Sequence, residues 1–300
     1  MEAGSIIEIP ALYAASHAGM MPQPKSSVFR YVSMKGDDAW SFLETTLLTN
    51  TLPLAASTIL NDPFEASPVI LNDTTTAEIA ASIKRFTIRQ GNADVPIDLD
   101  KLQVAGPDGA SLGPEALAKR TQELFEGMIA QRNRQCHIAS FSRRISSELQ
   151  WSHYADGHKG IAYHFVPTSS TESEFKGLKT VKYARQRPIV FLSELIDQIS
   201  IEPTSNKFVL SWLSYEERSF LAKSTEWSYE EEERVIKQNV GSMSFLESEL
   251  MSIIVGPRFN DENVSRLKAV VAKRRRPIKI YRAAPSQTDY SIEIKWSDPL

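Results

Sequence analysis

The stretch Ile161-Ala162-Tyr163-His164-Phe165-Val166 indicates the fold class, because a short, mostly apolar run of this kind is typical of a buried β-strand. Ile253-Ile254-Val255-Gly256 has the same character. Tyr290-Ser291-Ile292-Glu293-Ile294-Lys295-Trp296 alternates with period two and predicts a closing hairpin with residues 278–280. Cys136–Ser142 is a further expected strand.

Expected helices fall between these strands at irregular intervals, near residues 37–48, 191–200, 206–222 and 264–271. Short strands with irregularly placed helices predict an α+β protein with a mixed, mainly antiparallel sheet core surrounded by helices. We expect a loosely ordered arm over residues 1–26 and a single domain over 27–300.

Residues 66–135 are interpreted as a helical insertion in that domain. Its second half is opened by Gly113-Pro114, and its apolar residues recur at helical spacing. These apolar residues are Leu117, Leu124, Phe125, Met128 and Ile129.

The composition is that of a globular protein, with 42% hydrophobic and 24% charged residues and a net charge of −3. This balance provides no global positive field for nucleic acid or anionic lipid. Cys136 is the only cysteine, which excludes an internal disulfide framework and fits a reducing compartment. Without a signal-peptide pattern or an apolar run of ~20 residues, we expect a cytoplasmic protein with no membrane contact.

Several charged or histidine-rich segments allow two interpretations. The basic run Lys273–Arg276 suits either the negative end of a helix dipole or a nucleic-acid patch. His137, His153, His158 and His164 either bind a metal or make ordinary hydrogen bonds. We predict no metal site, because only Asp156 lies close to them in sequence.

The run Glu230-Glu231-Glu232-Glu233 follows Trp227 and Tyr229 and precedes Arg234. In a strand, Glu230, Glu232 and Arg234 would project to one face. Since glutamate is poor strand material, two interpretations remain open, a strand that carries a functional site and a plain exposed edge.

The order of several short motifs resembles the bacterial family known as domain of unknown function 2971. The motifs are Phe29-Arg30-Tyr31, Asn61-Asp62-Pro63-Phe64-Glu65, Ser140-Phe141-Ser142, Trp151-Ser152-His153-Tyr154, His158-Lys159-Gly160, Lys223 and Trp227–Arg234. The Asn61–Glu65 motif suits either a structural turn or the rim of a site that uses Asp62 or Glu65.

An Arg-bearing first strand, a Ser-x-Ser strand, an aromatic residue and a late Glu-x-Glu strand are also similar to ADP-ribosyltransferases. That resemblance implies a split β-sandwich that binds NAD as its substrate. It implies catalytic roles for Glu232 or Glu230, which would hold the ribose and stabilise the positive charge of the breaking glycosidic bond. The residues implied to bind NAD are Arg30, Tyr31, Ser140, Ser142, Tyr154 and Arg234.

Three functional hypotheses follow. The first is an enzyme that cleaves the nicotinamide–ribose bond and transfers ADP-ribose to a protein, a nucleic acid or water, as a toxin or phage-defence effector. The second is a non-catalytic binding or regulatory module of a toxin–antitoxin or defence system, with its glutamates on solvent-facing surface. The third is a metal-dependent hydrolase or nuclease in which His153 and His158 converge with an acidic residue.

Overall fold

The computed structural model describes residues 26–73, 75, 77, 81, 85, 114–202 and 207–300. The expected N-terminal arm therefore lies, apart from Ser26, outside the described residues. The chain divides into two compact units that are each built from separated segments. Unit 1 comprises residues 1–51, 142–173 and 245–300, and unit 2 comprises residues 52–141 and 174–244. The single domain expected over residues 27–300 thus contains two units, which are described separately.

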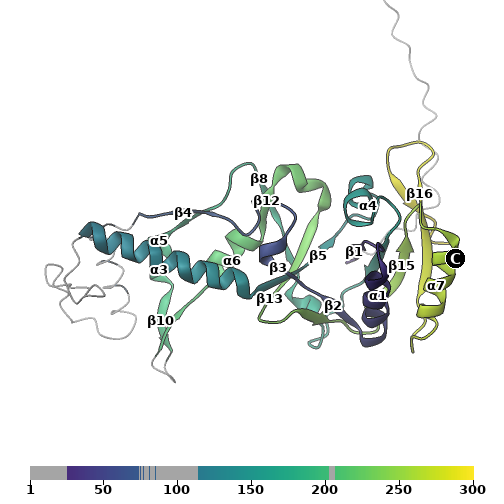
Figure 1. Ribbon diagram of the computed structural model, residues 1–300, viewed down its shortest axis with the longest axis horizontal. Helices are drawn as coiled ribbons and strands as arrows, with labels where there is room; N and C mark the ends of the chain where they lie inside the picture. The colour runs from purple at the N-terminus through teal and green to yellow at the C-terminus, as the bar shows by residue number, and fades with distance from the viewer. Residues whose placement is uncertain are drawn as a thin grey trace, which may run out of the picture. The chain divides into compact units, whose positions relative to one another are not determined.

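Unit 1 is built on strands β1, β6, β15, β16 and β17 (Figure 1). Their bounds are Val28–Val32, Ile161–Phe165, Leu250–Val255, Lys279–Pro285 and Ile292–Ile294. The β15–β16 pair is parallel, whereas β6 pairs antiparallel with both β1 and β15. The predicted strand at 161–166 is confirmed as β6, with every residue buried. The predicted closing hairpin is confirmed as the antiparallel β16–β17 pair.

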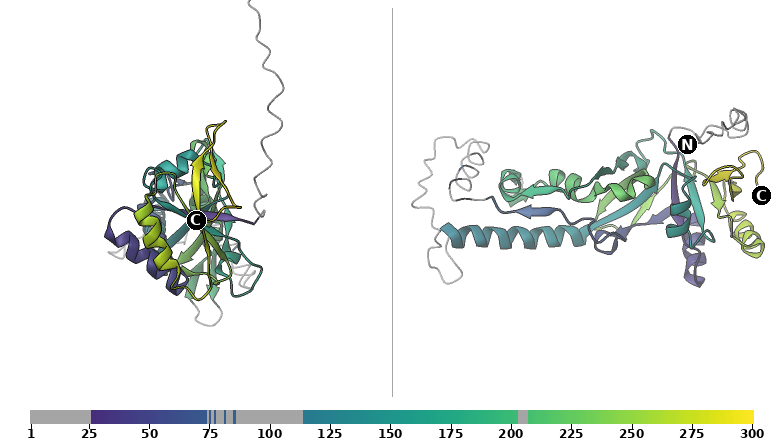
Figure 2. Two further views of the ribbon diagram at one scale, coloured as in Figure 1. Left: turned by 90° about the vertical axis from the view of Figure 1, so that its right-hand side faces the viewer. Right: turned by 90° about the horizontal axis from the view of Figure 1, so that it is seen from above.

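Helices α1 (Asp37–Thr49), α4 (Glu148–Tyr154) and α7 (Asp261–Val271) complete unit 1. Helices α1 and α7 lie side by side (Figures 1 and 2). The basic run after α7 takes part in this contact, because Arg274 donates to the Leu47 carbonyl near the end of α1. Arg274 therefore completes the C-terminal end of a helix other than its own.

Unit 2 has strand β5 (Cys136–Ser142) beside β13 (Glu232–Gln238), with β7 (Lys179–Thr180) on the far side of β13. β3 (Ala55–Ala56) pairs antiparallel with β5. The short strands form further pairs: β2 (Thr51–Pro53) with β14 (Ser242–Ser244), β4 (Val69–Leu71) with β9 (Ile189–Phe191), β8 (Lys182–Ala184) with β12 (Ala222–Ser224), and β10 (Ile199–Glu202) with β11 (Lys207–Leu210).

Helices α3 (Pro114–Gln135), α5 (Leu192–Asp197) and α6 (Leu213–Phe220) surround a separate apolar core in unit 2. Short 3-10 helices occur at η1 (Ser57–Ile59), η3 (Glu174–Gly177) and η4 (Thr225–Glu230). Buried residues of this core include Phe125 and Ile129 of α3, Leu195 of α5, and Tyr215 and Phe220 of α6. The predicted α+β class with a mixed, mainly antiparallel sheet is confirmed.

Three local predictions are corrected. The expected helical insertion is helical over α3, but residues 69–71 form β4, and most of 72–113 lies outside the described residues. The helix expected over 206–222 is split into β11 and α6. The strand expected from Trp227 to Ile236 begins only at Glu232, because residues 225–230 form η4. Residues 69–71 pair with the distant strand β9, whereas residues 207–210 form a hairpin with the neighbouring strand β10.

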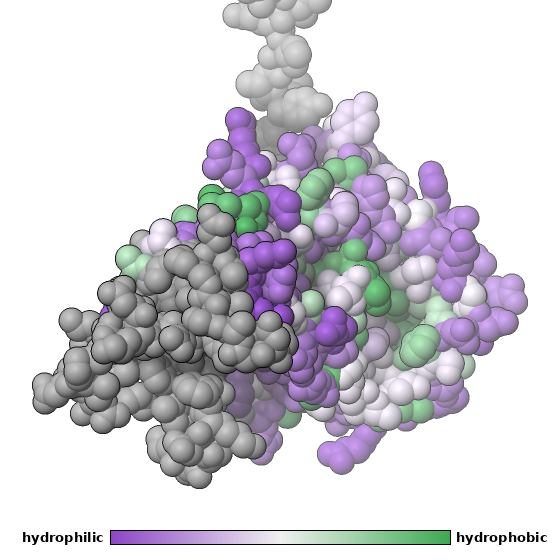
Figure 3. Space-filling model, turned by 60° about the vertical axis from the view of Figure 1, so that its left-hand side comes forward, coloured by the Kyte–Doolittle hydropathy of each residue, from purple (hydrophilic) through white to green (hydrophobic). Residues whose placement is uncertain are grey.

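The surface drawn in Figure 3 is largely hydrophilic, with separate small hydrophobic areas. Among the described residues, no helix combines the length and the apolarity needed to cross a bilayer.

Candidate functional site

The glutamate run changes direction at Glu231. Glu230 ends η4, and Glu231 has a left-handed backbone with φ 44° and ψ 53° before β13 begins at Glu232. The side chain of Glu231 is exposed, whereas Glu230, Glu232 and Glu233 are buried. The prediction that Glu232 and Arg234 share a face is confirmed by their contact, but Glu230 belongs to a different element.

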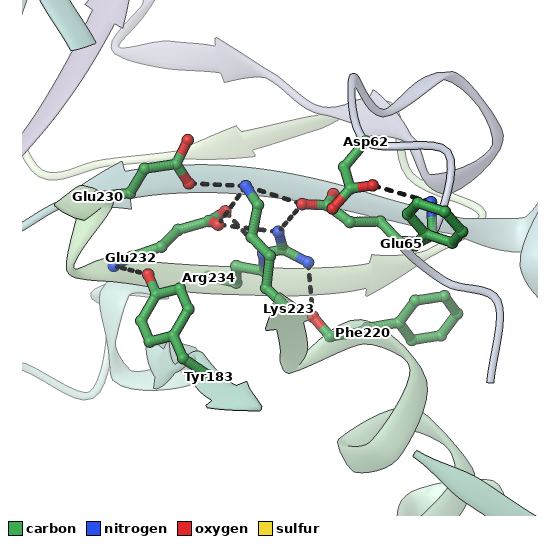
Figure 4. Close-up of polar contacts among 9 residues, drawn as sticks. Asp62, Glu65, Tyr183, Phe220, Lys223, Glu230, Glu232 and Arg234 are labelled. Atoms are coloured by element: carbon green, nitrogen blue, oxygen red, sulfur yellow. Dashed lines mark hydrogen bonds and ion pairs between the residues drawn. The ribbon is translucent and has the colours of Figure 1, made fainter. Parts of the chain in front are cut away.

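Arg234 is the centre of a buried hydrogen-bond cluster in unit 2 (Figure 4). Its Nε donates to Glu232 Oε1 over 2.6 Å, and its Nη2 donates to Glu232 Oε2 over 2.9 Å. Nη2 also reaches Glu65 Oε1 at 2.9 Å, and Nη1 donates to the Phe220 carbonyl at 2.8 Å. The guanidinium therefore ties β13 to the end of α6 and to the Asn61–Glu65 loop.

Lys223 of β12 is the second cation of the cluster. Its Nζ lies 2.8 Å from Glu65 Oε1, 2.6 Å from Glu230 Oε2 and 3.2 Å from Glu232 Oε2. The same Nζ is 4.8 Å from the centre of the Trp227 ring, which is a cation–π distance. Lys223 therefore joins carboxylates from η4, β13 and the Asn61–Glu65 loop (Figure 4).

The two cations keep the Glu232 carboxylate ionised. Burial alone would raise the pKa of Glu232, but the charges and hydrogen bonds of Arg234, the charge of Lys223 and a hydrogen bond from Ser140 lower it to about 2. The pKa of Lys223 is raised despite burial, because the carboxylates of Glu232, Glu65 and Glu230 stabilise its charged form. For Arg234, burial acts to lower the pKa, but the carboxylates of Glu232 and Glu65 outweigh burial. The pKa of Arg234 is therefore also raised.

Tyr183 of β8 supports the cluster through the backbone. Its hydroxyl accepts the Glu232 N–H over 2.8 Å. Burial is the largest influence on this phenol and raises its pKa to about 12, so it stays protonated near neutral pH. The first residue of β13 is therefore held by both its main chain and its side chain.

A pocket of about 260 Å³ opens beside the cluster, and Glu65 and Lys223 form part of its wall. The charged and aromatic groups elsewhere on the wall are Asp62, Phe64, Arg185 and Arg187. Arg187 holds the Ser67 carbonyl and hydroxyl, and its guanidinium carbon lies 5.9 Å from the centre of the Phe64 ring. The pocket thus combines an acidic loop, a buried lysine and two exposed arginines.

The residues predicted to form a site are divided between the units. Glu230, Glu232, Arg234 and Ser140 lie in unit 2 and meet in the cluster described above. The four other predicted NAD contacts lie in unit 1 and are Arg30, Tyr31, Ser142 and Tyr154.

Several contacts of these four residues lie within unit 1. Burial lowers the pKa of Arg30 to about 10, and Tyr163, its partner residue across the β1–β6 pair, has a smaller effect. The Tyr31 hydroxyl donates to the Arg144 carbonyl, and the Ser142 hydroxyl accepts from Gln150 Nε2. Tyr154 ends α4, where its ring lies 6.3 Å from that of His153.

From the sequence, Lys223 had no predicted chemical role, and Glu65 lay on the site rim in only one of two interpretations. A signal for Lys223 was present, because a glutamate run flanked by aromatic residues is buried only where cations compensate its charge. One arginine, Arg234, is too few for three carboxylates. Spacing alone could not identify Lys223 as the missing cation or Glu65 as a further carboxylate of the cluster, since they lie on separate elements.

Within the described ranges, no group of three or more His, Cys, Asp and Glu side chains is arranged to hold a metal ion. The convergence of His153, His158 and an acidic residue that the metal-dependent hypothesis predicts is therefore not observed in this part of the chain.

Comparison with known protein families gives a match over part of the chain. The family model described as "Protein of unknown function (DUF2971)" matches residues 150–235, which include Lys223, Glu230, Glu232 and Arg234. No curated protein and no solved structure matches the chain.

Proposed function

We propose that the chain binds NAD at the pocket of unit 2 and breaks its nicotinamide–ribose bond, passing ADP-ribose to a macromolecule or to water. We also infer membership of the DUF2971 family, since the matched segment carries four residues of the buried cluster. The observation that carries the proposal is Glu65, which lines the pocket and whose carboxylate is held by Lys223 and Arg234.

The reaction requires a fixed negative charge at the ribose. Breaking the nicotinamide bond makes an oxocarbenium-like centre, which a preorganised carboxylate stabilises best. Glu65 is the carboxylate of the cluster that lines the pocket, so we assign it the contact with the sugar. Glu232 and Glu230, the catalytic candidates from the sequence, act in this proposal as positioning residues through Arg234 and Lys223.

The other wall of the pocket supports an anionic ligand with flat rings. Arg185 and Arg187 are exposed there, and guanidinium groups suit phosphate oxygens. Phe64 is 62% exposed, so its ring is accessible to a nicotinamide or adenine ring. A pocket of about 260 Å³ is near the lower limit for small-molecule sites, which usually hold ~300–1,000 Å³. It would therefore hold one half of the dinucleotide.

A nucleotide-binding module without catalysis is the second candidate. It is favoured by the pairing of Glu232, whose two carboxylate oxygens both receive hydrogen bonds from Arg234. The same pairing is expected of an ion-pair network whose role is structural and not catalytic. The surface glutamates expected for a binding module are not observed, because three of the four glutamates in the run are buried.

The two candidates differ in whether free nicotinamide appears. NAD is incubated with the whole chain, nicotinamide is measured by chromatography and NAD binding by calorimetry. We expect Glu65→Gln to lower turnover by ~10²–10³, as is usual when one electrostatic contact to a transition state is removed. Glu217→Gln, an exposed change on α6, is the matched control.

Arg187→Ala separates binding from chemistry. We expect it to weaken NAD binding more than it lowers turnover at saturating NAD. Binding without nicotinamide release supports the module, whereas neither binding nor release in the wild-type chain contradicts both candidates.

A further inference from the structure

A second pocket, of about 270 Å³, lies against the same loop of unit 2. It shares Asp62 and Glu65 with the first pocket. The rest of its polar wall is neutral and comes from Ser57, Thr58, Ser67 and Asn133. Among the lining residues that the structure describes, there is no lysine, arginine or histidine. The wall of this pocket is therefore acidic.

Each of the two carboxylates has one oxygen that is already engaged. Asp62 Oδ1 accepts the Phe64 N–H at 2.9 Å, and Glu65 Oε1 is paired with Lys223 and Arg234. Among the described residues, Asp62 Oδ2 and Glu65 Oε2 take part in no hydrogen bond or ion pair. Because Asp62 is 6% and Glu65 9% exposed, these two oxygens are acceptors within a largely buried wall.

The neutral groups of the wall add few donors. Asn133 uses its side-chain nitrogen to hold the Ala66 carbonyl, and the Ser57 hydroxyl donates to the Asn133 carbonyl. The cations of the adjoining cluster are engaged by three carboxylates, so they do not balance Asp62 as well. A ligand that supplies both positive charge and several N–H donors would satisfy this wall.

We propose that the second pocket binds a guanidinium group. A guanidinium presents five N–H donors in a planar fork, so one group can reach both carboxylates, whereas an ammonium is a compact point charge. The volume is many times that needed for one water, so the group and the first atoms of its carrier fit. Glu65 and Asp62 line both pockets, but the inferred guanidinium binding does not rest on the NAD reaction proposed above.

The experiment titrates methylguanidinium into the whole chain by calorimetry at constant ionic strength and without NAD. N-methylurea, its neutral isostere, and methylammonium, its compact counterpart, are titrated in parallel. We expect methylguanidinium to bind most tightly of the three, and N-methylurea at least about tenfold more weakly, since a charge-assisted hydrogen bond is replaced by a neutral one. Glu217→Gln leaves the affinity unchanged.

Asp62→Asn keeps the acceptor for the Phe64 N–H but removes the charge, and should weaken methylguanidinium binding by about tenfold or more. Should this variant fail to fold, Thr58→Arg provides a second test, because it places a guanidinium of the chain itself in the pocket wall and should abolish binding of the free probe. The proposal is overturned if methylguanidinium does not bind, if the three probes bind equally or if methylammonium binds more tightly. It is also overturned if the folded variants bind methylguanidinium as the wild-type chain does. NAD turnover is not used, so the result does not depend on the function proposed above.

Discussion

Glu232 shows what a buried charge requires of its neighbours. It is 4% exposed and is held by Arg234, Lys223 and Ser140. Glu232→Gln keeps the shape but leaves both cations undercompensated, and breaking a buried ion pair commonly costs ~3–5 kcal/mol. We therefore expect a loss of this size in the free energy of unfolding, measured in urea.

The neighbouring residue supplies the control for this change. Glu231 is exposed, so Glu231→Gln should stay within ~0.5 kcal/mol of the wild-type value. Equal effects of the two substitutions would show that the contacts of Glu232 contribute nothing to stability.

His164 of unit 1 predicts a loss of stability in mild acid. It is 7% exposed, stacks on Phe29 and lies within hydrogen-bond distance of Ser27 and Ser252. Burial lowers its pKa from 6.5 to about 4. Between these values the unfolded chain binds the proton more strongly, so stability falls as the pH is lowered from 6.5 to 4, by up to ~3 kcal/mol.

Substitution of His164 tests this dependence. His164→Gln keeps hydrogen-bonding capacity but cannot titrate, so its free energy of unfolding should vary less with pH in this window. His153→Gln, at an exposed position of α4, should keep the wild-type dependence. Identical pH profiles for all three proteins would contradict the role assigned to His164.

At the scale of elements, the sequence predicted those that bury a continuous apolar run. β6 and β5 begin and end within one residue of their predicted limits, because all residues of β6 and five of the seven residues of β5 are buried. The boundary between η4 and β13 was missed, because the turn that separates them depends on one left-handed backbone at a residue whose type does not demand it.

The candidate site was predictable only in part, for a related reason. Glu232 and Arg234 are two residues apart on a strand, so strand periodicity was sufficient to place them on one face. Glu65 is 169 residues from Arg234, and only the tertiary fold shows that the two are in contact. The resemblance that linked Arg30 and Tyr154 to Glu232 relied on chain order, and the structure assigns those two residues to the other unit.

The left-handed backbone of Glu231, between η4 and β13, predicts which substitutions at this position are the more stable. A non-glycine residue in this conformation costs ~1–2 kcal/mol, and a β-branched side chain costs more. Because the Glu231 side chain is exposed, substitutions there act chiefly through the backbone. Glu231→Val should be less stable than Glu231→Gly by at least ~1 kcal/mol in thermal unfolding. The reverse order would mean that this backbone conformation is not kept in solution.

At the scale of the molecule, the chain passes between its two units more than once. Unit 1 combines segments from the start, middle and end of the chain, and unit 2 combines the two segments between them. Each unit has its own apolar core and its own buried titrating side chain, His164 in unit 1 and Glu232 in unit 2. Acid should therefore act on the two units through different groups.

The pKa values of these groups predict the order in which the units open. The stability that neutral His164 contributes falls as the pH is lowered from 6.5 to about 4, whereas the stability that charged Glu232 contributes falls only between pH 4.5 and about 2. Acid-exposed protein is pulse-labelled with deuterium at one fixed pH and analysed by peptide mass. Peptides of residues 161–165 should lose protection at higher pH than peptides of 232–238. His164→Gln should move the first transition to lower pH and leave the second in place. A single transition shared by both peptides would show instead that the units unfold together, with one acid-sensitive group controlling the whole chain.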